Sequence, residues 1–189
     1  MKNEIESSLK ESISLKTELL SSSVDSIIKI ANILVEAYRT GHSLYLMGNG
    51  GSAADAQHIA GELIGRFKKN RKPLPALALS TDTSVLTAIA NDFGYDQCFE
   101  RQVDAFVMEG DVVIGLSTSG NSLSIINAAL SAKKKSAKTI AFTGEGGGYL
   151  KDNVDVCLEI PSKDTARIQE CHITIGHILC SIIEKELFV

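Results

Sequence analysis

The sequence contains no tryptophan and only three prolines among its 189 residues, and aromatic side chains make up 5% of it. Basic residues are also in short supply, because 19 lysines and arginines face 23 aspartates and glutamates, for a formal net charge of −4. An acidic chain with few aromatic residues is poorly suited to follow a phosphate backbone. We therefore expect no nucleic acid partner.

Long apolar runs are absent too, since none reaches the ~18 residues that a membrane-spanning helix needs, and we expect no membrane partner. The first residues, MKNEIESSLKESISLK, carry charges and lack the apolar core of a secretory signal, so we expect a cytoplasmic protein. The four cysteines form no CxxC pair and predict neither a zinc ribbon nor a disulfide framework. Hydrophobic residues make up 44% of the chain, which is enough for a substantial core.

The pattern from residue 43 onward is a series of short apolar runs separated by helical segments. The runs lack the polar alternation of half-exposed strands, which indicates strands buried on both faces. We expect strands at 43–47, 74–79, 112–116, 139–142 and 156–160, and helices near 52–66, 83–91, 96–108, 122–136 and 165–187. This order predicts an α/β fold with an open, doubly wound, parallel sheet of five strands flanked by helices.

The first 40 residues show apolar side chains at three- and four-residue spacing, which predicts helices. The cluster Ser21–Ser23 is expected to divide them into two, and Gly41 to end the second. This N-terminal helical arm carries no chemical motif and is expected to pack on the core and on partner subunits. We expect one domain over residues 1–189.

A glycine-rich turn, Gly48-Asn49-Gly50-Gly51-Ser52, follows the first expected strand. Its glycines allow close approach of a ligand, and the next helix offers free N–H groups to an anion. A dinucleotide site needs an acidic residue about 20 positions later, where this chain has lysines, and no P-loop lysine follows either. A nucleotide is therefore disfavoured, and an ordinary tight turn is the simpler alternative.

A second turn, Ser117-Thr118-Ser119-Gly120-Asn121-Ser122, follows the third expected strand and places four hydroxyls around one glycine. Hydroxyls and backbone N–H groups at a helix start can bind phosphate without a lysine. Capping the helix would need only one such residue. We therefore predict a phosphate-binding turn.

Two pairs of polar residues lie on expected helices. His58 and Glu62 are four residues apart and share a helix face. Gln169 and His177 lie about 80° apart on the apolar last helix. For His58 and Glu62 alone, a surface ion pair or a core histidine is the simpler explanation. For the last helix alone, a structural buried histidine is simpler. Together, the two pairs favour a functional site. The turn 91–94, the glycine-rich turn 143–148 and the basic run 66–72 are interpreted as structural, the last as a solvated loop.

The segments GNGGS, HIAGEL, NDFG, STSGNS and RIQECH, with HIL after it, occur in this order and resemble the sugar isomerase (SIS) domain family, within it the phosphoheptose isomerases. The resemblance covers essentially the whole chain. It implies an aldose–ketose isomerase that converts D-sedoheptulose 7-phosphate to D-glycero-D-manno-heptose 7-phosphate through an enediol, for surface polysaccharides such as lipopolysaccharide or capsule. It also implies a homotetramer with active sites at subunit interfaces.

The resemblance further implies roles for individual residues. One zinc ion per subunit would be held by His58, Glu62, Gln169 and His177. Glu62 and His177 would be the catalytic acid–base pair. The phosphate would be bound by Ser117, Thr118, Ser119 and Ser122. The other substrate contacts would be Asn49, Gly50, Gly51, Ser52, Glu62, Asn91, Asp92 and Gln169. Ala166 departs from the pattern, because some family members carry an aspartate there.

Two other interpretations stay open. GNG followed by SAA, LTAIAND and ARIQE also resemble a non-catalytic SIS-domain regulator, the replication-initiator-associating protein. That type lacks the full set of two histidines, glutamate and glutamine, which this chain contains. A binding module for another sugar phosphate would need the serine-rich turn but neither Glu62 nor His177.

Overall fold

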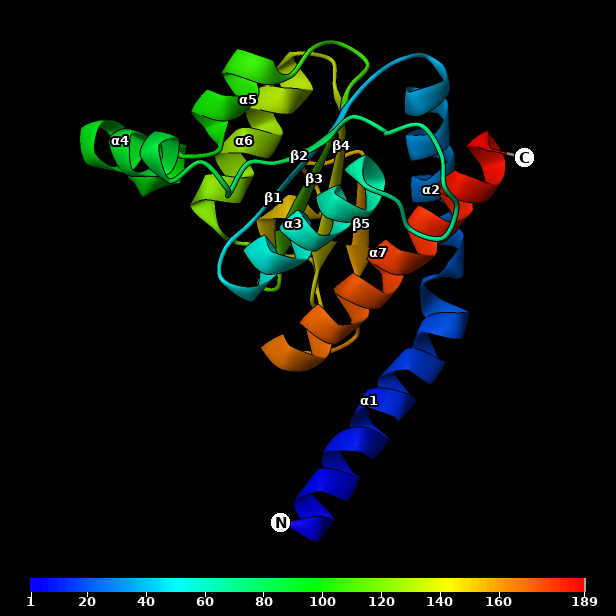
Figure 1. Cartoon of the computed structure of the whole chain (residues 1–189). Helices are drawn as coiled ribbons and strands as arrows, with labels where there is room; N and C mark the ends of the chain where they lie inside the picture. Colours follow the sequence, from blue (N-terminus) through cyan, green and yellow to red (C-terminus); the bar gives the residue numbers. More distant parts are fainter. Residues whose placement is uncertain (189) are drawn as a thin grey trace.

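The computed structural model describes residues 1–188, and a five-stranded sheet forms its centre (Figure 1). The strands are β1 (Leu44–Gly48), β2 (Ala76–Ala78), β3 (Val112–Ser117), β4 (Lys138–Thr143) and β5 (Val156–Glu159). Their spatial order is β2-β1-β3-β4-β5, and every neighbouring pair is parallel. The expected α/β class with a parallel, doubly wound sheet is confirmed.

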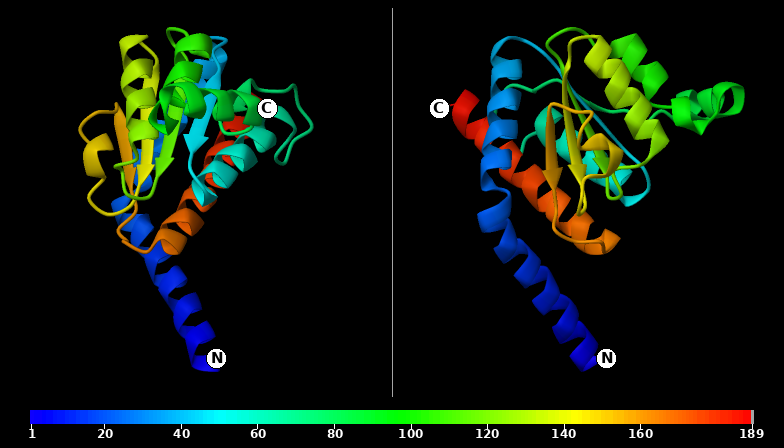
Figure 2. Two further views of the ribbon diagram at one scale, coloured as in Figure 1. Left: turned by 90° about the vertical axis from the view of Figure 1, so that its left-hand side faces the viewer. Right: turned by 180° about the vertical axis from the view of Figure 1, so that it is seen from behind.

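Helices cover both faces of this sheet (Figures 1 and 2). The α-helices are α1 (Lys2–Ser22), α2 (Val24–Arg39), α3 (Gly51–Ile64), α4 (Thr83–Phe93), α5 (Glu100–Phe106), α6 (Leu123–Lys134) and α7 (Thr165–Leu187). Two 3-10 turns, η1 (Tyr95–Gln97) and η2 (Gly148–Leu150), lie between them. Helices α2, α3 and α7 pack on one face, and α5 and α6 pack on the other.

The two faces of the sheet explain the absence of polar alternation in the strands. All six residues of β3 are buried. Val112 and Ile114 belong to the core on the side of α2, α3 and α7, whereas Val113 belongs to the core on the side of α5 and α6. Successive side chains point to opposite faces, so a strand covered on both faces needs apolar residues throughout.

The register of the sheet brings two polar turns together. Gly48 at the end of β1 pairs with Leu116 near the end of β3. The glycine-rich turn after β1 and the serine-rich turn after β3 therefore begin at the same edge. The strand order reverses between β1 and β3, and ligands of open α/β sheets bind at such a point.

The N-terminal arm consists of two helices that divide at Ser23, as expected from the serine cluster. Helix α1 extends away from the sheet (Figures 1 and 2) and contacts the start of α7, where Ser12 donates a hydrogen bond of 2.8 Å to Glu170. Its Ile5, Leu9 and Ile13 side chains are exposed. Within residues 1–188, no helix is long and apolar enough to cross a membrane.

Two expected elements are shorter than their patterns. The strand expected at 74–79 covers only Ala76–Ala78, because Pro75 has no N–H to give to a ladder. The helix expected at 96–108 is divided into η1 and α5. Neither change moves the turns that follow β1 and β3.

Candidate functional site

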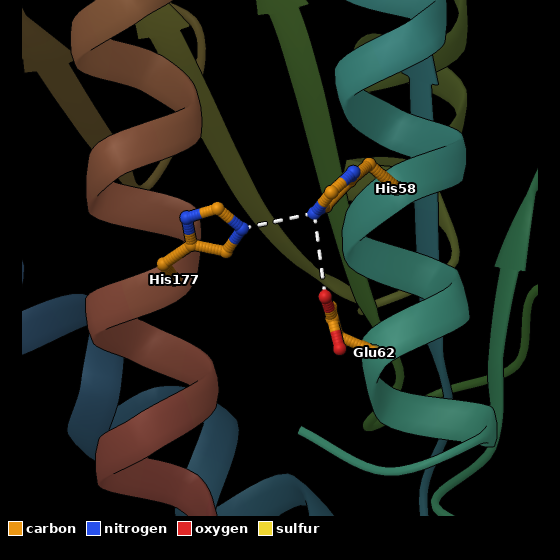
Figure 3. Close-up of side chains that lie close together, drawn as sticks. All are labelled: His58, Glu62 and His177. Carbon is orange, nitrogen blue, oxygen red and sulfur yellow. Dashed lines mark hydrogen bonds and ion pairs between the residues drawn. The ribbon is translucent and has the colours of Figure 1, made fainter. Parts of the chain in front are cut away.

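Helices α3 and α7 lie side by side and carry the predicted polar pairs (Figures 1 and 3). Gly176 of α7 faces Ile59 of α3, and a Cβ atom on this glycine would lie 2.7 Å from the Ile59 side chain. The glycine therefore permits the close approach of the two helices. The neighbouring residues His177 and His58 meet as a consequence.

Three polar side chains converge between these helices (Figure 3). The Nε2 atoms of His58 and His177 lie 2.9 Å apart, and His58 Nε2 lies 3.3 Å from Glu62 Oε1. One ligating atom from each of the three residues lies within 4.8 Å of the other two. Glu62 and His177 are half-buried and His58 is exposed. The arrangement combines two imidazoles with a carboxylate, which is a set of proton-transfer groups and of metal ligands.

The donor set of this triad fits a zinc ion. Histidine nitrogen and carboxylate oxygen are ordinary zinc ligands, and sites with two histidines and one glutamate are a known catalytic class. Bonds of about 2.0–2.1 Å in a tetrahedral site place neighbouring donor atoms roughly 3.3 Å apart. The His58–Glu62 distance of 3.3 Å matches that spacing, and the distance between the imidazoles is shorter.

A polar cavity of about 340 Å³ lies where the strand order reverses. It is lined by Asn49, Gly50, Gly51, Ser52, Leu116, Ser117, Thr118, Ser122, Thr165 and Gln169. Eight of these residues are predicted site residues, and they come from the turns after β1 and β3 and from α7. The structure thus brings these eight predicted residues together around one cavity. Thr165, the first residue of α7, is a lining residue that the sequence analysis missed.

Gln169 lies beside this cavity. Its amide packs over Gly51, where a Cβ atom would lie 2.7 Å from the amide nitrogen and oxygen. Gly51 precedes His58 by seven residues, so Gln169 contacts α3 about two helical turns, or roughly 10 Å, before the triad. Gln169 therefore lies between the two turns and apart from the three other predicted zinc ligands.

The hydroxyls of the serine-rich turn do not cap helix α6. Ser122 occupies the N-cap of α6, but its side chain makes no capping bond and its hydroxyl accepts a bond of 3.2 Å from Ser117. The Ser119 hydroxyl accepts the Asn121 N–H at 3.1 Å. Helix capping alone thus does not explain the hydroxyls. Within the described residues 1–188, Ser119 lies on the turn but outside the lining of the cavity.

The predicted contacts Asn91 and Asp92 lie at the exposed end of α4. The Asn91 amide donates to Asp92 at 2.8 Å. Nearby, the Tyr95 hydroxyl donates to Asn49 Oδ1 at 2.6 Å and connects this segment to the glycine-rich turn. In the described chain, 1–188, Asn91 and Asp92 also lie outside the lining of the cavity.

Asp55 lies one turn before His58 on α3 and is a residue that the sequence analysis missed. Burial raises the pKa of its carboxyl, and the nearby His58 partly offsets this. Its Oδ2 atom is buried and has no hydrogen-bond partner among residues 1–188. The sequence could have indicated this residue, because Asp55 and His58 are three positions apart and residues at that spacing share a helix face.

The basic run 66–72 is not a purely solvated loop, so that expectation was wrong for one residue. The side chain of Arg71 is only 1% exposed and forms an ion pair of 3.0 Å with the buried Glu184 of α7. Phe67, in the same loop, stacks on the His177 ring with centroids 5.6 Å apart. The composition of a run rich in lysine and arginine does not show which of its charged side chains is buried.

Comparisons with known proteins show what the whole chain is similar to. The model of the SIS domain family matches residues 9–144. A phosphoheptose isomerase of Roseiflexus sp. (strain RS-1) is 52% identical over 180 residues, which are 95% of this chain and 91% of the relative. The solved phosphoheptose isomerase GmhA of Neisseria gonorrhoeae is 40% identical with a TM-score of 0.93, covering 97% of this chain and 98% of that one. The corresponding structure from Francisella tularensis is 36% identical with a TM-score of 0.94, covering 97% of both chains.

Proposed function

The chain belongs to the SIS domain family and within it to the phosphoheptose isomerases, and on that basis we propose that it converts D-sedoheptulose 7-phosphate to D-glycero-D-manno-heptose 7-phosphate. It is an aldose–ketose isomerase. One observation of the structure supports the substrate most directly. The triad of His58, Glu62 and His177 lies about two turns of α3 from a hydroxyl-lined cavity. A long sugar phosphate has its reacting carbons and its phosphate at opposite ends.

The serine-rich turn binds the phosphate and thereby orients the far end of the sugar. Ser117, Thr118 and Ser122 line the cavity, and the N-terminus of α6 adds its positive end. Binding at this remote group places C1 and C2 at the triad, so binding free energy is used for orientation.

Glu62 and His177 carry out the proton transfers. The Glu62 carboxylate removes a proton from C1 of the ketose, an enediol forms, and the proton returns to C2. His177 transfers protons at the oxygens of C1 and C2. Positioned groups of this kind contribute about 10²–10⁴-fold to the rate.

One zinc ion per subunit is the proposed cofactor. His58, Glu62 and His177 would hold it, and Gln169 is the proposed fourth ligand. Zinc bound there would polarise the carbonyl and hydroxyl oxygens of the sugar. The proposal has a direct test, which is the zinc content of the purified protein.

The proposed assembly is a homotetramer in the cytoplasm with active sites at subunit interfaces, and its product serves surface polysaccharides such as lipopolysaccharide or capsule. The exposed apolar side chains Ile5, Leu9 and Ile13 of α1 support an assembly, because an apolar stripe of this kind is stabilised by burial. Light scattering on the purified protein measures the mass. Ile13→Glu should lower it, and a monomeric wild type would contradict the proposal.

The decisive experiment is incubation with D-sedoheptulose 7-phosphate and detection of the aldose product. We expect turnover by the wild type and a loss of at least 100-fold in kcat for Glu62→Gln, because the amide cannot accept the proton. Glu186→Gln is the matched control, since Glu186 is half-exposed in a surface ion pair with Arg39. Binding of the sugar phosphate without turnover would contradict the proposal and favour a regulator or binding module.

A further inference from the structure

We propose that Phe67 is a positioning residue that holds the His177 imidazole in place, and that the buried pair of Arg71 and Glu184 anchors the loop that presents it. The inference rests on the proposed function, in which His177 binds the metal and transfers protons. The loop follows α3 and runs over the last turns of α7 to Pro73. It belongs to neither helix, yet it contacts both.

Glu184 collects four donors from this loop. Its carboxylate accepts the backbone N–H groups of Phe67 at 2.9 Å, Lys68 at 2.8 Å and Lys69 at 2.9 Å, and the Arg71 Nε–H at 3.0 Å. Burial alone would raise the pKa of Glu184, but these donors outweigh it and keep the pKa below its usual value. Glu184 therefore stays charged and fixes three consecutive backbone amides.

Arg71 extends the same network to the end of α3. Its guanidinium donates to the backbone carbonyl of Glu62 at 2.8 Å and to that of Leu63 at 2.5 Å. Carbonyls in the last turn of a helix have no partner inside the helix. Arg71 thus caps α3 at the residue whose carboxylate belongs to the triad. Glu184 lies seven residues after His177, two turns along the same face of α7.

The hydrogen bonds of Glu184 and Arg71 hold the loop so that the Phe67 side chain lies against the triad. Its ring stacks on the His177 ring with an angle of 17° between planes and 5.6 Å between centroids. His58 contacts the same imidazole edge-on, with centroids 4.9 Å apart. The imidazole is therefore restrained by Phe67 while its Nε2 atom faces His58. Outer-shell groups that orient a ligating histidine through a hydrogen bond usually affect metal affinity or activity by about 10- to 100-fold. A stacked ring that restrains the same imidazole acts in the same direction, and we expect an effect near the lower end of that range.

The burial of the ion pair indicates that it positions the loop and the end of α3, more than that it stabilises the fold as a whole. The Arg71 and Glu184 side chains are 1% and 2% exposed. Burying both charges carries a desolvation penalty that offsets much of their attraction, so such a pair adds little stability relative to apolar residues of similar volume. Its hydrogen bonds all lead to the backbone of the loop and of α3, which are the two segments that set the positions of Phe67 and Glu62.

The test measures zinc affinity and kinetics together. For Phe67→Leu, which keeps apolar bulk but removes the ring, we expect about a tenfold loss in affinity of the metal-free protein for Zn²⁺, measured by competition with a chromophoric chelator. We also expect kcat to fall and KM to change less than twofold. Phe67→Tyr keeps the ring and should restore both values to within twofold of the wild type. Phe106→Leu is the matched control, because Phe106 is an exposed phenylalanine at the end of α5.

A second pair of variants tests the anchor. Glu184→Gln should lower zinc affinity and kcat in the same direction as Phe67→Leu, whereas Glu186→Gln, two residues further on α7, should change neither. If Phe67→Leu lowers only the melting temperature and leaves Zn²⁺ affinity and kcat unchanged, the inference is overturned. If the wild type binds no zinc and turns over no heptose phosphate, the proposed function itself is overturned. This outcome is seen before any variant is made, so it is distinct from a failure of the inference about Phe67.

Discussion

The Nε2 atoms of His58 and His177 lie 2.9 Å apart, although 119 positions separate the two residues in the chain. Each histidine comes from a helix that packs on the same face of the sheet, and the glycine at 176 lets those helices approach. Glu62 follows His58 by one turn and faces the same point. The contact between these two imidazoles thus creates the proposed metal and proton-transfer centre.

Removal of the metal should abolish turnover reversibly. Incubation with a strong chelator followed by gel filtration should reduce kcat at least 100-fold, and addition of one equivalent of Zn²⁺ per subunit should restore it. The reason is that an ion held by His58, Glu62 and His177 would polarise the oxygens of the sugar, and its removal would end that polarisation. Activity that survives while metal analysis shows far less than one zinc ion per subunit would exclude a catalytic role for the ion.

Gly120→Ala should weaken phosphate binding. Gly120 has a φ of +66°, and a Cβ atom there would lie 2.0 Å from the carbonyl oxygen of Gly147. The serine-rich turn would have to move away from the loop that supports it, so KM for the sugar phosphate should rise about tenfold or more. Steady-state kinetics provides the measurement.

The control for that change is Gly146→Ala. Gly146 also has a positive φ, +85°, but a Cβ atom there meets no neighbour within 4 Å. We expect only a loss of about 1 kcal/mol in the free energy of unfolding and an unchanged KM. Equal effects of both variants on KM would mean that backbone strain, not the contact with the serine-rich turn, is responsible.

His172 should make the protein less stable in mild acid. It is fully buried, and burial lowers its pKa to about 4, although the bond to the Thr143 carbonyl opposes this. Between pH 6.5 and 4 the unfolded chain binds a proton that the folded chain does not, so the free energy of unfolding falls with pH by up to about 3 kcal/mol. His172→Gln should flatten this slope in urea unfolding at fixed protein concentration. An unchanged slope would assign the acid sensitivity to other groups.

Glu184 should contribute stability that acid removes at lower pH. Because its folded pKa lies below its unfolded value of about 4.3, the contribution is fully present above that value and is lost as pH falls through the folded pKa. Glu184→Gln should therefore be destabilised by about 3 kcal/mol at pH 7, since it leaves Arg71 buried without its partner. The difference from the wild type should shrink below pH 4. A difference that is constant from pH 7 to pH 3 would contradict this account.

Much of the fold was predictable because its signals are local. Strands covered on both faces need continuous apolar runs, and these runs predicted all five strands in order, although β2 covers only three residues. The last helix was expected at 165–187 and covers Thr165–Leu187. The two polar turns were predicted to follow the first and third strands, and the parallel register of the sheet does place those strand ends at one edge.

The site depended on information that no short segment contains. Helical periodicity places His58 beside Glu62, but only the packing of α3 on α7 determines that His177 joins them and that Gln169 lies over Gly51 instead. The partner of Arg71 lies 113 positions away in the chain, so the basic loop was expected to be solvated. The elements, their order and the chemistry of the turns could be read from the residues alone, because these follow from backbone geometry and hydrophobic pattern over a few residues. Which side chains meet emerged only in the folded chain, because the distance between two helices is set by the shape of everything packed between and around them.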